Sequence, residues 1–522
     1  MASRARSGIW LAVFAACVIA AGAKSIALGK DANWDLKNYH GYNAWALLND
    51  RLGWDLAPAQ IQTYYNPVGD LPFHFLVQWL PWPRHVAFWM ALSTALAAFF
   101  LIRILALLFP VGRERGALAW IAAAAAIGVT GAAGQATIGS TMNEWPSAAL
   151  LMAALWLAVR ALVEGEDRHP RAFATAAFLA GCAVGLKLTY GVFGLAFLVA
   201  MGSFGPWRER ARRLALAAAL MLAGVLVFGG YWGWVMWREF ANPTFPYYNH
   251  VFNSPWWEQA AYFDPNYGPR NAAHWLFFPF YFSHQSKLVS EVGFRDYRLA
   301  VLMLLALLAA AKRLLPWEKA GMRVDPAWRF LAIFTLAAYV AWIKLFGIYR
   351  YLVPLELVSG ALVVGCLMYL MRDMRARYAA VAVLALLLIG TTRPMSWGRI
   401  PFSHGYFEVK VPELPPNALV IVGYSHPMAY VIPFFRADAR FVSPANNFLM
   451  PDQGNLLARR IDEVIRKHAG PLYLMEYRSR VPQDEATLRH FGLAFDAAPC
   501  EGIRSPMSDN FMQVCRLGRT PG

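Results

Sequence analysis

Residues 214–237 read LALAAALMLAGVLVFGGYWGWVMW, a stretch without a single charged side chain. An α-helix rises about 1.5 Å per residue, so this stretch is long enough to cross a hydrocarbon core roughly 30 Å thick. Further uncharged runs extend over residues 9–23, 120–142 and 330–342. Because such runs recur along the chain, the sequence predicts a polytopic α-helical membrane protein.

The composition supports this prediction. Of the 522 residues 58% are hydrophobic and only 15% are charged, and the mean hydropathy is +0.37. Soluble domains carry about 25% charged residues, so this balance excludes a soluble multidomain enzyme.

The formal net charge of +16 arises from Lys and Arg that cluster in alternate connections between the apolar runs. Cytoplasmic connections of membrane proteins carry such an excess. If about eleven helices are drawn, every cluster falls on the cytoplasmic side together with the N-terminus. The clusters are Arg4/Arg6, Arg113/Arg115, Arg168/Arg171, Arg208–Arg213, Lys312–Arg329 and Arg372–Arg377. Membrane anchoring therefore accounts for the charge, and we expect membrane lipids as partners and no nucleic acid.

The first apolar run follows two arginines, as the core of a signal peptide would, but more spans follow it. We therefore interpret it as a retained signal-anchor of a multi-pass protein in a bacterial inner membrane. The membrane part is expected to occupy residues 1–392. Its periplasmic face receives two large loops, residues 31–83 and 238–298, and shorter connections at 139–146, near Lys187 and at 347–351.

Residues 393–522 have the composition of a water-soluble fold and are expected in the periplasm. Short apolar runs alternate with a segment of helical period around Ile461, which predicts a small α/β domain. No glycine-rich phosphate loop, metal-spaced Cys/His set or nucleophile elbow occurs in this tail, so we assign it no chemistry. The apolar runs are Ala418–Val422, Arg440–Val442, Leu472–Tyr477 and Met512–Cys515.

Two of the five cysteines, Cys500 and Cys515, fall in this tail, whereas the others lie inside predicted spans. A pair of cysteines in an oxidising compartment predicts a disulfide. The alternative is two reduced cysteines that are unrelated to each other.

The first periplasmic loop concentrates polar groups beside a helix end, in the sequence DANWDLKNYH at residues 31–40. An ionised carboxylate that is partly shielded from water can act as a general base on a hydroxyl group, and Asp35 fits this role. On a helix continuing from Asp35, Tyr39 shares its face and Asn38 lies beside it. Tyr65 follows later in the loop. The alternative is that Asp35 only caps this helix.

Glu144 lies in a short connection, GSTMNEWP at residues 139–146, between two apolar helices. Ionisable residues near the membrane face indicate function, although Glu144 also suits the dipole of a helix start. Cations on the same face are scarce, and the exceptions are Lys187, Lys344 and Arg350, the last flanked by Tyr349 and Tyr351. They are candidates to bind an anionic group such as a lipid phosphate. The alternative is that their long side chains only extend to the lipid headgroups.

The third outer loop, residues 238–298, is strongly aromatic and contains His284. Its aromatic side chains either anchor the loop in the membrane interface or stack on sugar rings and prenyl chains. His284, His40 and His250 each lack a second ligand at metal spacing, so a metal site is not expected. The sequence requires no cofactor, and a divalent metal has no support in it.

Four short elements in order along the membrane part resemble motifs of the GT-C superfamily of polytopic glycosyltransferases. The resemblance is to the protein O-mannosyltransferase and aminoarabinose transferase families. Asp35-Leu-Lys-Asn-Tyr39 resembles their acidic first-loop motif, with Leu36 in place of Glu, and Tyr65-Asn-Pro-Val68 resembles a later element. Glu144-Trp-Pro146 resembles a second acidic motif with Glu for Asp, and Arg350-Tyr-Leu-Val-Pro354 resembles a late basic one.

The resemblance implies a catalytic domain over residues 1–392 and transfer of a hexose or pentose from a polyprenyl-phosphate donor to an envelope acceptor. Asp35 would take the acceptor proton, Lys187 and Arg350 would stabilise the leaving phosphate, and Glu144 would orient the acceptor or Asp35. Asn38, Tyr39, Tyr65, Tyr351 and His284 would bind substrate. The competing interpretations are a transporter or flippase, a polysaccharide polymerase or ligase, and an inactive scaffold.

Overall fold

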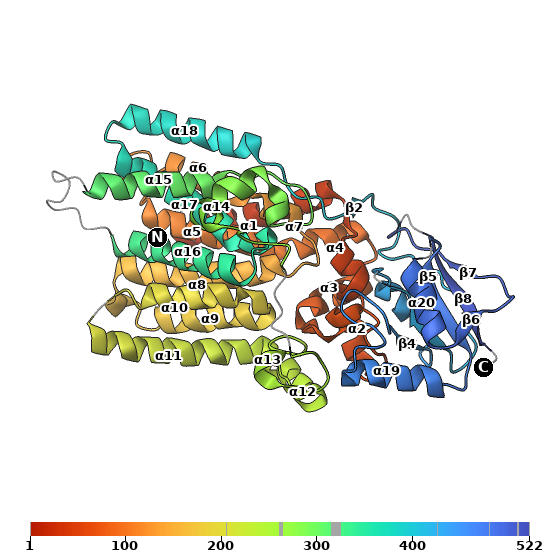
Figure 1. The fold of residues 1–522 in the computed structure, drawn as a ribbon. Helices are drawn as coiled ribbons and strands as arrows, with labels where there is room; N and C mark the ends of the chain where they lie inside the picture. Colours follow the sequence, from red (N-terminus) through yellow and green to blue (C-terminus); the bar gives the residue numbers. More distant parts are fainter. Residues whose placement is uncertain are drawn as a thin grey trace.

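The chain folds into a helical bundle at one end and a mixed sheet at the other, with α2 (Asn43–Leu48), α3 (Leu71–Trp79) and α4 (Pro83–Met90) between them (Figure 1). The structure is a computed structural model that describes residues 2–204, 206–259, 265–314, 325–424, 426–479, 481–508 and 511–520. Residues 315–324 of the basic connection 312–329 lie outside the described residues.

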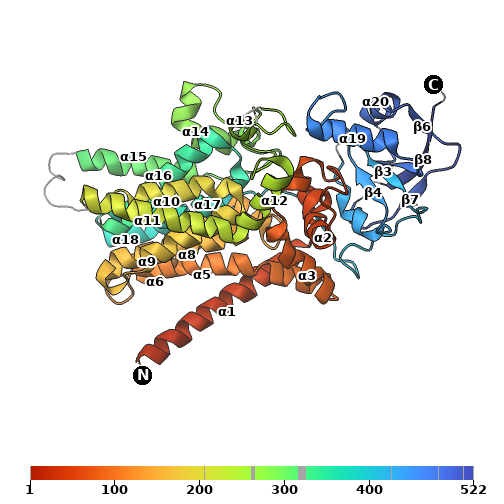
Figure 2. The same cartoon turned by 90° about the horizontal axis from the view of Figure 1, so that it is seen from below.

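The bundle helices run side by side (Figures 1 and 2), except that the first of them diverges from the others toward its N-terminal end in Figure 2. They are α1 (Ala2–Leu28), α5 (Leu92–Leu108), α6 (Ala117–Val129), α8 (Glu144–Glu164), α9 (Ala172–Leu186), α10 (Gly191–Met201), α11 (Trp207–Val225), α15 (Arg298–Leu314), α16 (Pro326–Leu345), α17 (Val353–Leu370) and α18 (Met374–Thr391). Between α11 and α15 the chain forms α12 (Tyr231–Phe240), α13 (Asn249–Phe252) and α14 (Ala272–His284).

Among the described residues, seven helical segments are long and apolar enough to cross a membrane, and three shorter apolar helices accompany them. The protein is therefore a multi-pass membrane protein, while the number of eleven spans stays a prediction. The longest segment, Trp207–Phe240, contains the run 214–237 and joins α11 to α12 through a π-helical turn, Leu226–Gly230.

Helices α9 and α11 approach each other closely because glycines face the contact. A Cβ atom added to Gly181 would lie 2.0 Å from the carbonyl oxygen of Met221, and one added to Gly224 would lie 2.1 Å from that of Phe178. Small residues allow this close backbone packing, which stabilises helix pairs in lipid where the hydrophobic effect does not.

Helical hydrogen bonding is interrupted between α6 and α7 (Ala132–Thr137), and a buried ionic cluster pairs with the backbone groups that are left free there. The Arg298 guanidinium donates to Asp296 at 2.7 Å, to the carbonyl oxygen of Ile127 and to that of Thr130 at 2.9 Å. The carbonyls of Ile127 and Thr130 are at the end of α6. We call Asp296, Arg298 and Glu356 the bundle cluster.

The two carboxylates of the bundle cluster accept the free amides at the start of α7. Asp296 accepts from the amide of Ala132 at 2.9 Å, and Glu356 of α17 accepts from those of Ala133 and Gly134 at 3.0 and 2.8 Å. A helix broken inside a membrane protein must have these groups satisfied by protein partners. The cluster therefore holds α7, and the loop that follows it, against α17.

The C-terminal part forms a six-stranded sheet in the order β4-β3-β5-β8-β6, with β7 also paired to β8. The strands β3, β4 and β5 are parallel, and β8 runs antiparallel to β5, β6 and β7. Helices α19 (Leu456–Lys467) and α20 (Pro482–His490) accompany it. The strands are β3 (Leu419–Val422), β4 (Arg440–Val442), β5 (Leu472–Tyr477), β6 (Leu493–Phe495), β7 (Glu501–Ile503) and β8 (Met512–Arg519).

The predicted apolar runs coincide with β3, β4, β5 and the first half of β8, and the predicted helical segment is α19. The apolar stripe of α19, including Ile461 and Ile465, packs with Ile421 and Leu474 of the sheet. The predicted sheet with helices is thus confirmed. Cys500 and Cys515 are joined by a disulfide, with Cα atoms 4.2 Å apart, beside the β7–β8 pairing.

The first loop is docked on the C-terminal sheet domain. Arg51 donates to Asp55 at 2.8 Å and to the carbonyl oxygens of Ala437 and Ala439 at 2.6 Å, and Asp55 accepts from the amide of Phe441 at 2.8 Å. In addition, β1 (Lys30–Asp31) pairs antiparallel with β2 (Arg399–Ile400). The loop that contains Asp35 is therefore held between the bundle and the sheet domain.

Candidate functional site

Four charged side chains from distant parts of the sequence meet at the end of the bundle that faces the sheet domain. Asp35 precedes a π-helical turn at Leu36–His40, Glu144 begins α8, Lys187 lies between α9 and α10, and Arg350 lies in a 3-10 turn before α17. Arg350 Nη1 lies 3.0 Å from Asp35 Oδ2, and Lys187 Nζ lies 2.5 Å from Glu144 Oε1. Arg350 Nε lies 3.8 Å from the same Glu144 oxygen. We call these four residues the site cluster.

Asp35 does not cap the turn that follows it. Its side chain makes no capping hydrogen bond, whereas Asn33 Oδ1 accepts from the amide of Leu36 at 2.8 Å. Asp31 in turn accepts from Asn33 Nδ2 at 2.8 Å and from the amide of Thr141 at 2.8 Å. The capping interpretation of Asp35 is therefore wrong: the cap is Asn33, and the Asp35 carboxylate is left to meet Arg350.

The site cluster is largely shielded from solvent but not sealed. The side chains of Asp35 and Arg350 are 13% and 15% exposed, that of Lys187 is 19% exposed and that of Glu144 is fully buried. Within the described residues, Glu144 Oε2 and Arg350 Nε are buried and lack a hydrogen-bond partner. Buried polar atoms are nearly always paired in folded proteins, so two unpaired ones in a single cluster indicate room for a ligand.

The charges around Asp35 oppose the effect of its burial. Burial raises the pKa of the Asp35 carboxyl, but Arg350, His40 and Lys187 lower it more, so the net pKa lies below the ordinary aspartate value. Neighbouring cations favour the charged form of a carboxyl. Asp35 is therefore an ionised carboxylate at neutral pH, as a general base requires.

Aromatic rings surround the cations of the cluster. The Tyr351 ring lies 5.3 Å from Lys187 Nζ and 5.5 Å from the Arg350 guanidinium carbon. The Trp397 ring, from the segment after α18, lies 5.3 Å from that carbon. Such cation–π contacts help to hold a cation in place. Trp397 was missed by sequence reasoning because it follows the last span, far from the motifs.

The remaining predicted residues of the first loop form one side of the site. The Tyr39 and Tyr65 rings are 5.4 Å apart, and the Tyr65 hydroxyl is bonded to that of Tyr247. Asn38 is buried and donates to the carbonyl oxygen of Ala59 at 3.2 Å and to Gln62 Oε1 at 3.4 Å.

Two histidines differ from their predicted places. His40 is not a lone histidine, because its Nδ1 lies 2.6 Å from Asp70 Oδ1, and Asn143 Nδ2 donates to the same oxygen at 3.3 Å. No sequence signal links residues so far apart. His284 is exposed at the end of α14 and makes none of the contacts that join the site cluster.

Glu144 contacts both cations of the site cluster. Its carboxylate lies against Lys187 and Arg350, and its carbonyl oxygen accepts from Tyr190 Oη at 2.6 Å. The role of Glu144 in orienting the acceptor or Asp35 stays a prediction. In the part of the chain that the structure describes, no three His, Cys, Asp or Glu side chains gather as a metal site would require.

Comparison with known proteins gives two structural neighbours. No protein-family model and no curated protein sequence matches the chain. The chain is similar to the crystal structure of ArnT from Cupriavidus metallidurans in the apo state, with 12% identity, 98% of both chains covered and a TM-score of 0.48. It is also similar to that of ArnT from the same organism bound to undecaprenyl phosphate, with 12% identity, coverage of 97% and 98%, and a TM-score of 0.47.

Proposed function

We propose that the protein is a membrane glycosyltransferase that moves a sugar from a polyprenyl-phosphate donor to an acceptor hydroxyl. The observation that carries this proposal is the site cluster, in which two cations and two carboxylates converge while Arg350 Nε and Glu144 Oε2 have no partner among the described residues. Its four residues are those of the sequence motifs and of the turn near Lys187.

The cations supply the phosphate site. Arg350 Nη1 donates to Asp35, and Arg350 Nε has no hydrogen-bond partner among the described residues, so Nε is the donor that we assign to a phosphate oxygen. Lys187 adds a second positive charge at the same Glu144 oxygen that Arg350 Nε approaches. Because Glu144 and Tyr351 fix both cations before the substrate arrives, little reorganisation is needed when negative charge develops on the leaving group.

Asp35 supplies the base. The acceptor hydroxyl gives its proton to the Asp35 carboxylate while its oxygen forms a bond to the anomeric carbon of the donor. The bond between that carbon and the phosphate oxygen breaks, and the lipid phosphate leaves with the bonding electron pair. Attack from the side opposite to the phosphate inverts the anomeric configuration. Asp35 loses its negative charge as the leaving phosphate gains one, and both groups lie next to the Arg350 guanidinium. The ion pair of Asp35 with Arg350 therefore links proton transfer to departure of the phosphate.

We further propose the orientation of the protein in the membrane. The basic connections place the N-terminus in the cytoplasm of a bacterial cell and the sheet domain in the periplasm. The donor then enters from the outer leaflet of the inner membrane, at the end of the bundle where the site cluster lies. Residues 1–392 form the catalytic domain, and residues 393–522 hold its first loop in place.

The test is transfer of radiolabelled sugar from a panel of polyprenyl-phosphate sugars into envelope material. Membranes containing wild-type protein are compared with membranes containing Asp35→Asn and, as a matched control, Asp167→Asn, which changes an exposed carboxylate at the other end of the bundle. We expect transfer by the wild type and by Asp167→Asn, and a loss of about 10²- to 10⁴-fold in Asp35→Asn at equal protein level. Equal transfer by all three removes Asp35 from its role. No transfer from any donor favours a transporter or a scaffold.

A further inference from the structure

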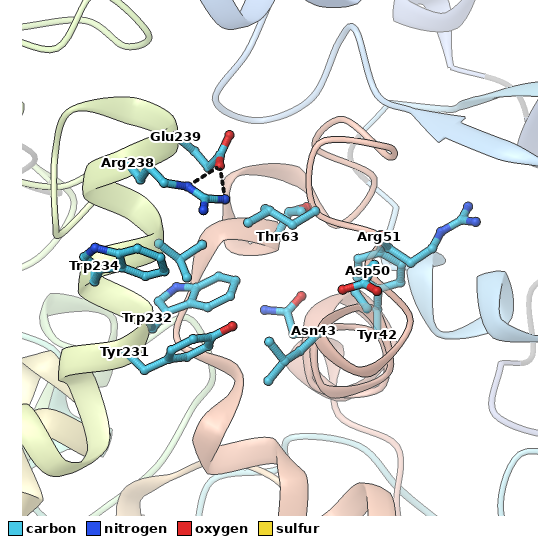
Figure 3. A pocket seen from close by; sticks show the side chains of 14 residues that line it. Tyr42, Asn43, Asp50, Arg51, Thr63, Tyr231, Trp232, Trp234, Arg238 and Glu239 are labelled. Atoms are coloured by element: carbon cyan, nitrogen blue, oxygen red, sulfur yellow. Dashed lines mark hydrogen bonds and ion pairs between the residues drawn. The ribbon is translucent and has the colours of Figure 1, made fainter.

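A cavity lies between α2 and α12, apart from the site cluster. It has a volume of about 260 Å³ and is lined by residues of both helices, among them Tyr42, Asn43, Asp50, Tyr231, Trp232 and Trp234. Figure 3 shows Asn43 between the aromatic side chains of α12 and Tyr42 of α2. Cavities for drug-sized ligands have roughly 300–1,000 Å³, so this one suits a smaller group such as a single sugar ring.

The lining combines aromatic faces with polar groups. Trp232 is fixed by its indole N–H, which donates to the carbonyl oxygen of Tyr64 at 2.9 Å, while Trp234 is 55% exposed and Tyr231 is 60% exposed. Asn43 is only 3% exposed and donates to the carbonyl oxygen of Gln62 at 2.8 Å, but its Oδ1 has no partner among the described residues. Aromatic faces next to hydrogen-bonding groups match the apolar face and the hydroxyls of a sugar.

The charged side chains that line the cavity sum to no net charge and give no net attraction for an anionic ligand. Its two cations are already paired, Arg51 with Asp55 and Arg238 with Glu239, each at 2.8 Å. Asp50 adds a carboxylate that no cation of the described residues pairs within ion-pair distance. The cavity therefore favours a neutral or amino sugar over a phosphate, which is the reverse of the preference of Lys187 and Arg350.

The cavity adjoins the proposed active site through one residue. Gln62 accepts from Asn43 with its carbonyl oxygen and from Asn38 with its side-chain oxygen, at 2.8 and 3.4 Å, and Asn38 is three residues from Asp35. In depth, the cavity lies near the membrane surface. The segment Trp207–Phe240 has 34 residues, about 50 Å of helix, so its last turns project beyond a hydrocarbon core of roughly 30 Å.

We propose that this cavity binds a saccharide ring of the acceptor, separately from the donor phosphate. The inference rests on the proposed glycosyl transfer and deepens it, because it divides the two substrates between a cationic site and an aromatic one with no net charge.

The test measures binding of sugars to the full-length protein in lipid nanodiscs by saturation-transfer difference NMR. The probes are methyl glucoside, methyl mannoside and glucosamine, with inorganic phosphate as a competitor. Trp234→Ala removes a cavity wall. Trp237→Ala is the matched control, because Trp237 is 54% exposed on the same helix but does not line the cavity. Arg350→Gln disables the proposed phosphate site.

We expect at least one sugar to bind wild type, Trp237→Ala and Arg350→Gln equally, Trp234→Ala to bind about tenfold more weakly, and phosphate not to compete. Three outcomes overturn the proposal: no sugar binds the wild type, Trp234→Ala binds as well as the wild type, or Arg350→Gln and phosphate abolish binding. The second outcome would assign Trp234 to membrane anchoring. Failure of the proposed transfer reaction is seen separately, as binding without labelled transfer from any donor.

Discussion

The bundle cluster and the site cluster are both groups of buried charged side chains among the described residues, and they differ in how completely their atoms are paired. In the bundle cluster, the nitrogens of Arg298 donate to Asp296, Ile127 and Thr130, and both oxygens of Glu356 accept backbone amides. None of the side-chain atoms of this cluster is left unpaired. In the site cluster, one oxygen of Glu144 and one nitrogen of Arg350 have no partner among the described residues.

This difference separates a structural role from a functional one. A buried charge network that is fully satisfied specifies one arrangement of the backbone, here the break between α6 and α7. A network with unpaired buried atoms is costly for the folded protein alone, and a ligand that pairs those atoms removes the cost. The bundle cluster is also sealed from solvent, whereas the side chains of Asp35, Arg350 and Lys187 are 13% to 19% exposed, so incomplete pairing and solvent access together distinguish the site cluster.

The largest effect is expected when the central cation of the bundle cluster is removed. Arg298→Met leaves Asp296 and Glu356 without a counter-charge and leaves carbonyl groups of α6 unpaired. We expect the free energy of unfolding to fall by about 3–5 kcal/mol, because one partner of a buried ion pair is lost. The melting temperature in detergent, followed by size-exclusion chromatography, measures this loss. The control is Arg168→Met, which changes an exposed arginine and should melt like the wild type.

A melting temperature of Arg298→Met equal to that of the control would show that the bundle cluster is not structural. Sugar transfer by Arg298→Met is expected to fall only in proportion to the amount of folded protein.

The second test removes the central cation of the site cluster. Arg350→Gln keeps a polar side chain, although a shorter one, and loses the charge that meets Asp35 and the phosphate. We expect kcat/KM for transfer to fall by on the order of 3 kcal/mol in transition-state free energy, the scale seen when one preorganised group is removed from a developing charge. Stability should change far less than in Arg298→Met, because the fork of Arg350 is only partly engaged.

Labelled transfer and the melting temperature of Arg350→Gln are measured on the same preparation. A variant that melts like Arg298→Met and loses transfer only through unfolding would place Arg350 with the structural arginines and contradict the division between the clusters.

The sequence pattern predicted the residues of the site cluster but not those of the bundle cluster, and the reason is physical. Asp35, Glu144, Lys187 and Arg350 stand beside the ends of apolar runs, where a charge on the outer face is conspicuous against the positive-inside pattern. Glu356 lies in the first turn of α17, whereas Asp296 precedes α15 and Arg298 begins it. Their meeting depends on the packing of α7 against α17, which no local pattern encodes.

The same limit applies to the contacts between the first loop and the sheet domain. The strands β3, β5 and β8 and the helix α19 follow from local periodicity. Leu56 pairs with the β4 strand, and Arg51 donates to the carbonyl of Ala439. Both contacts join residues almost 400 positions apart. Trp397 beside Arg350 is likewise a consequence of that long-range docking.

The pH dependence of transfer tests the role of Asp35 in the site cluster directly. In the wild type the pKa of Asp35 lies below its ordinary value of about 3.9, because Arg350, His40 and Lys187 outweigh the effect of burial. A group with a lowered pKa in the folded state stabilises the protein at pH values above its unfolded pKa, and this contribution is lost as the pH falls through the folded pKa. The acid limb of kcat/KM should therefore lie below about pH 4.

In Arg350→Gln the largest opposing charge is gone, and burial then moves the pKa of Asp35 upward. The acid limb measured with the residual activity should shift to higher pH, while the Arg168→Met control keeps the wild-type profile. An unshifted limb in Arg350→Gln would mean that the titrating base is not the carboxylate next to Arg350, and the assignment would pass from Asp35 to another group. A shift without any loss of kcat/KM at high pH would instead keep Asp35 as the base and remove Arg350 from phosphate stabilisation, because only the charge on Asp35 would then depend on it.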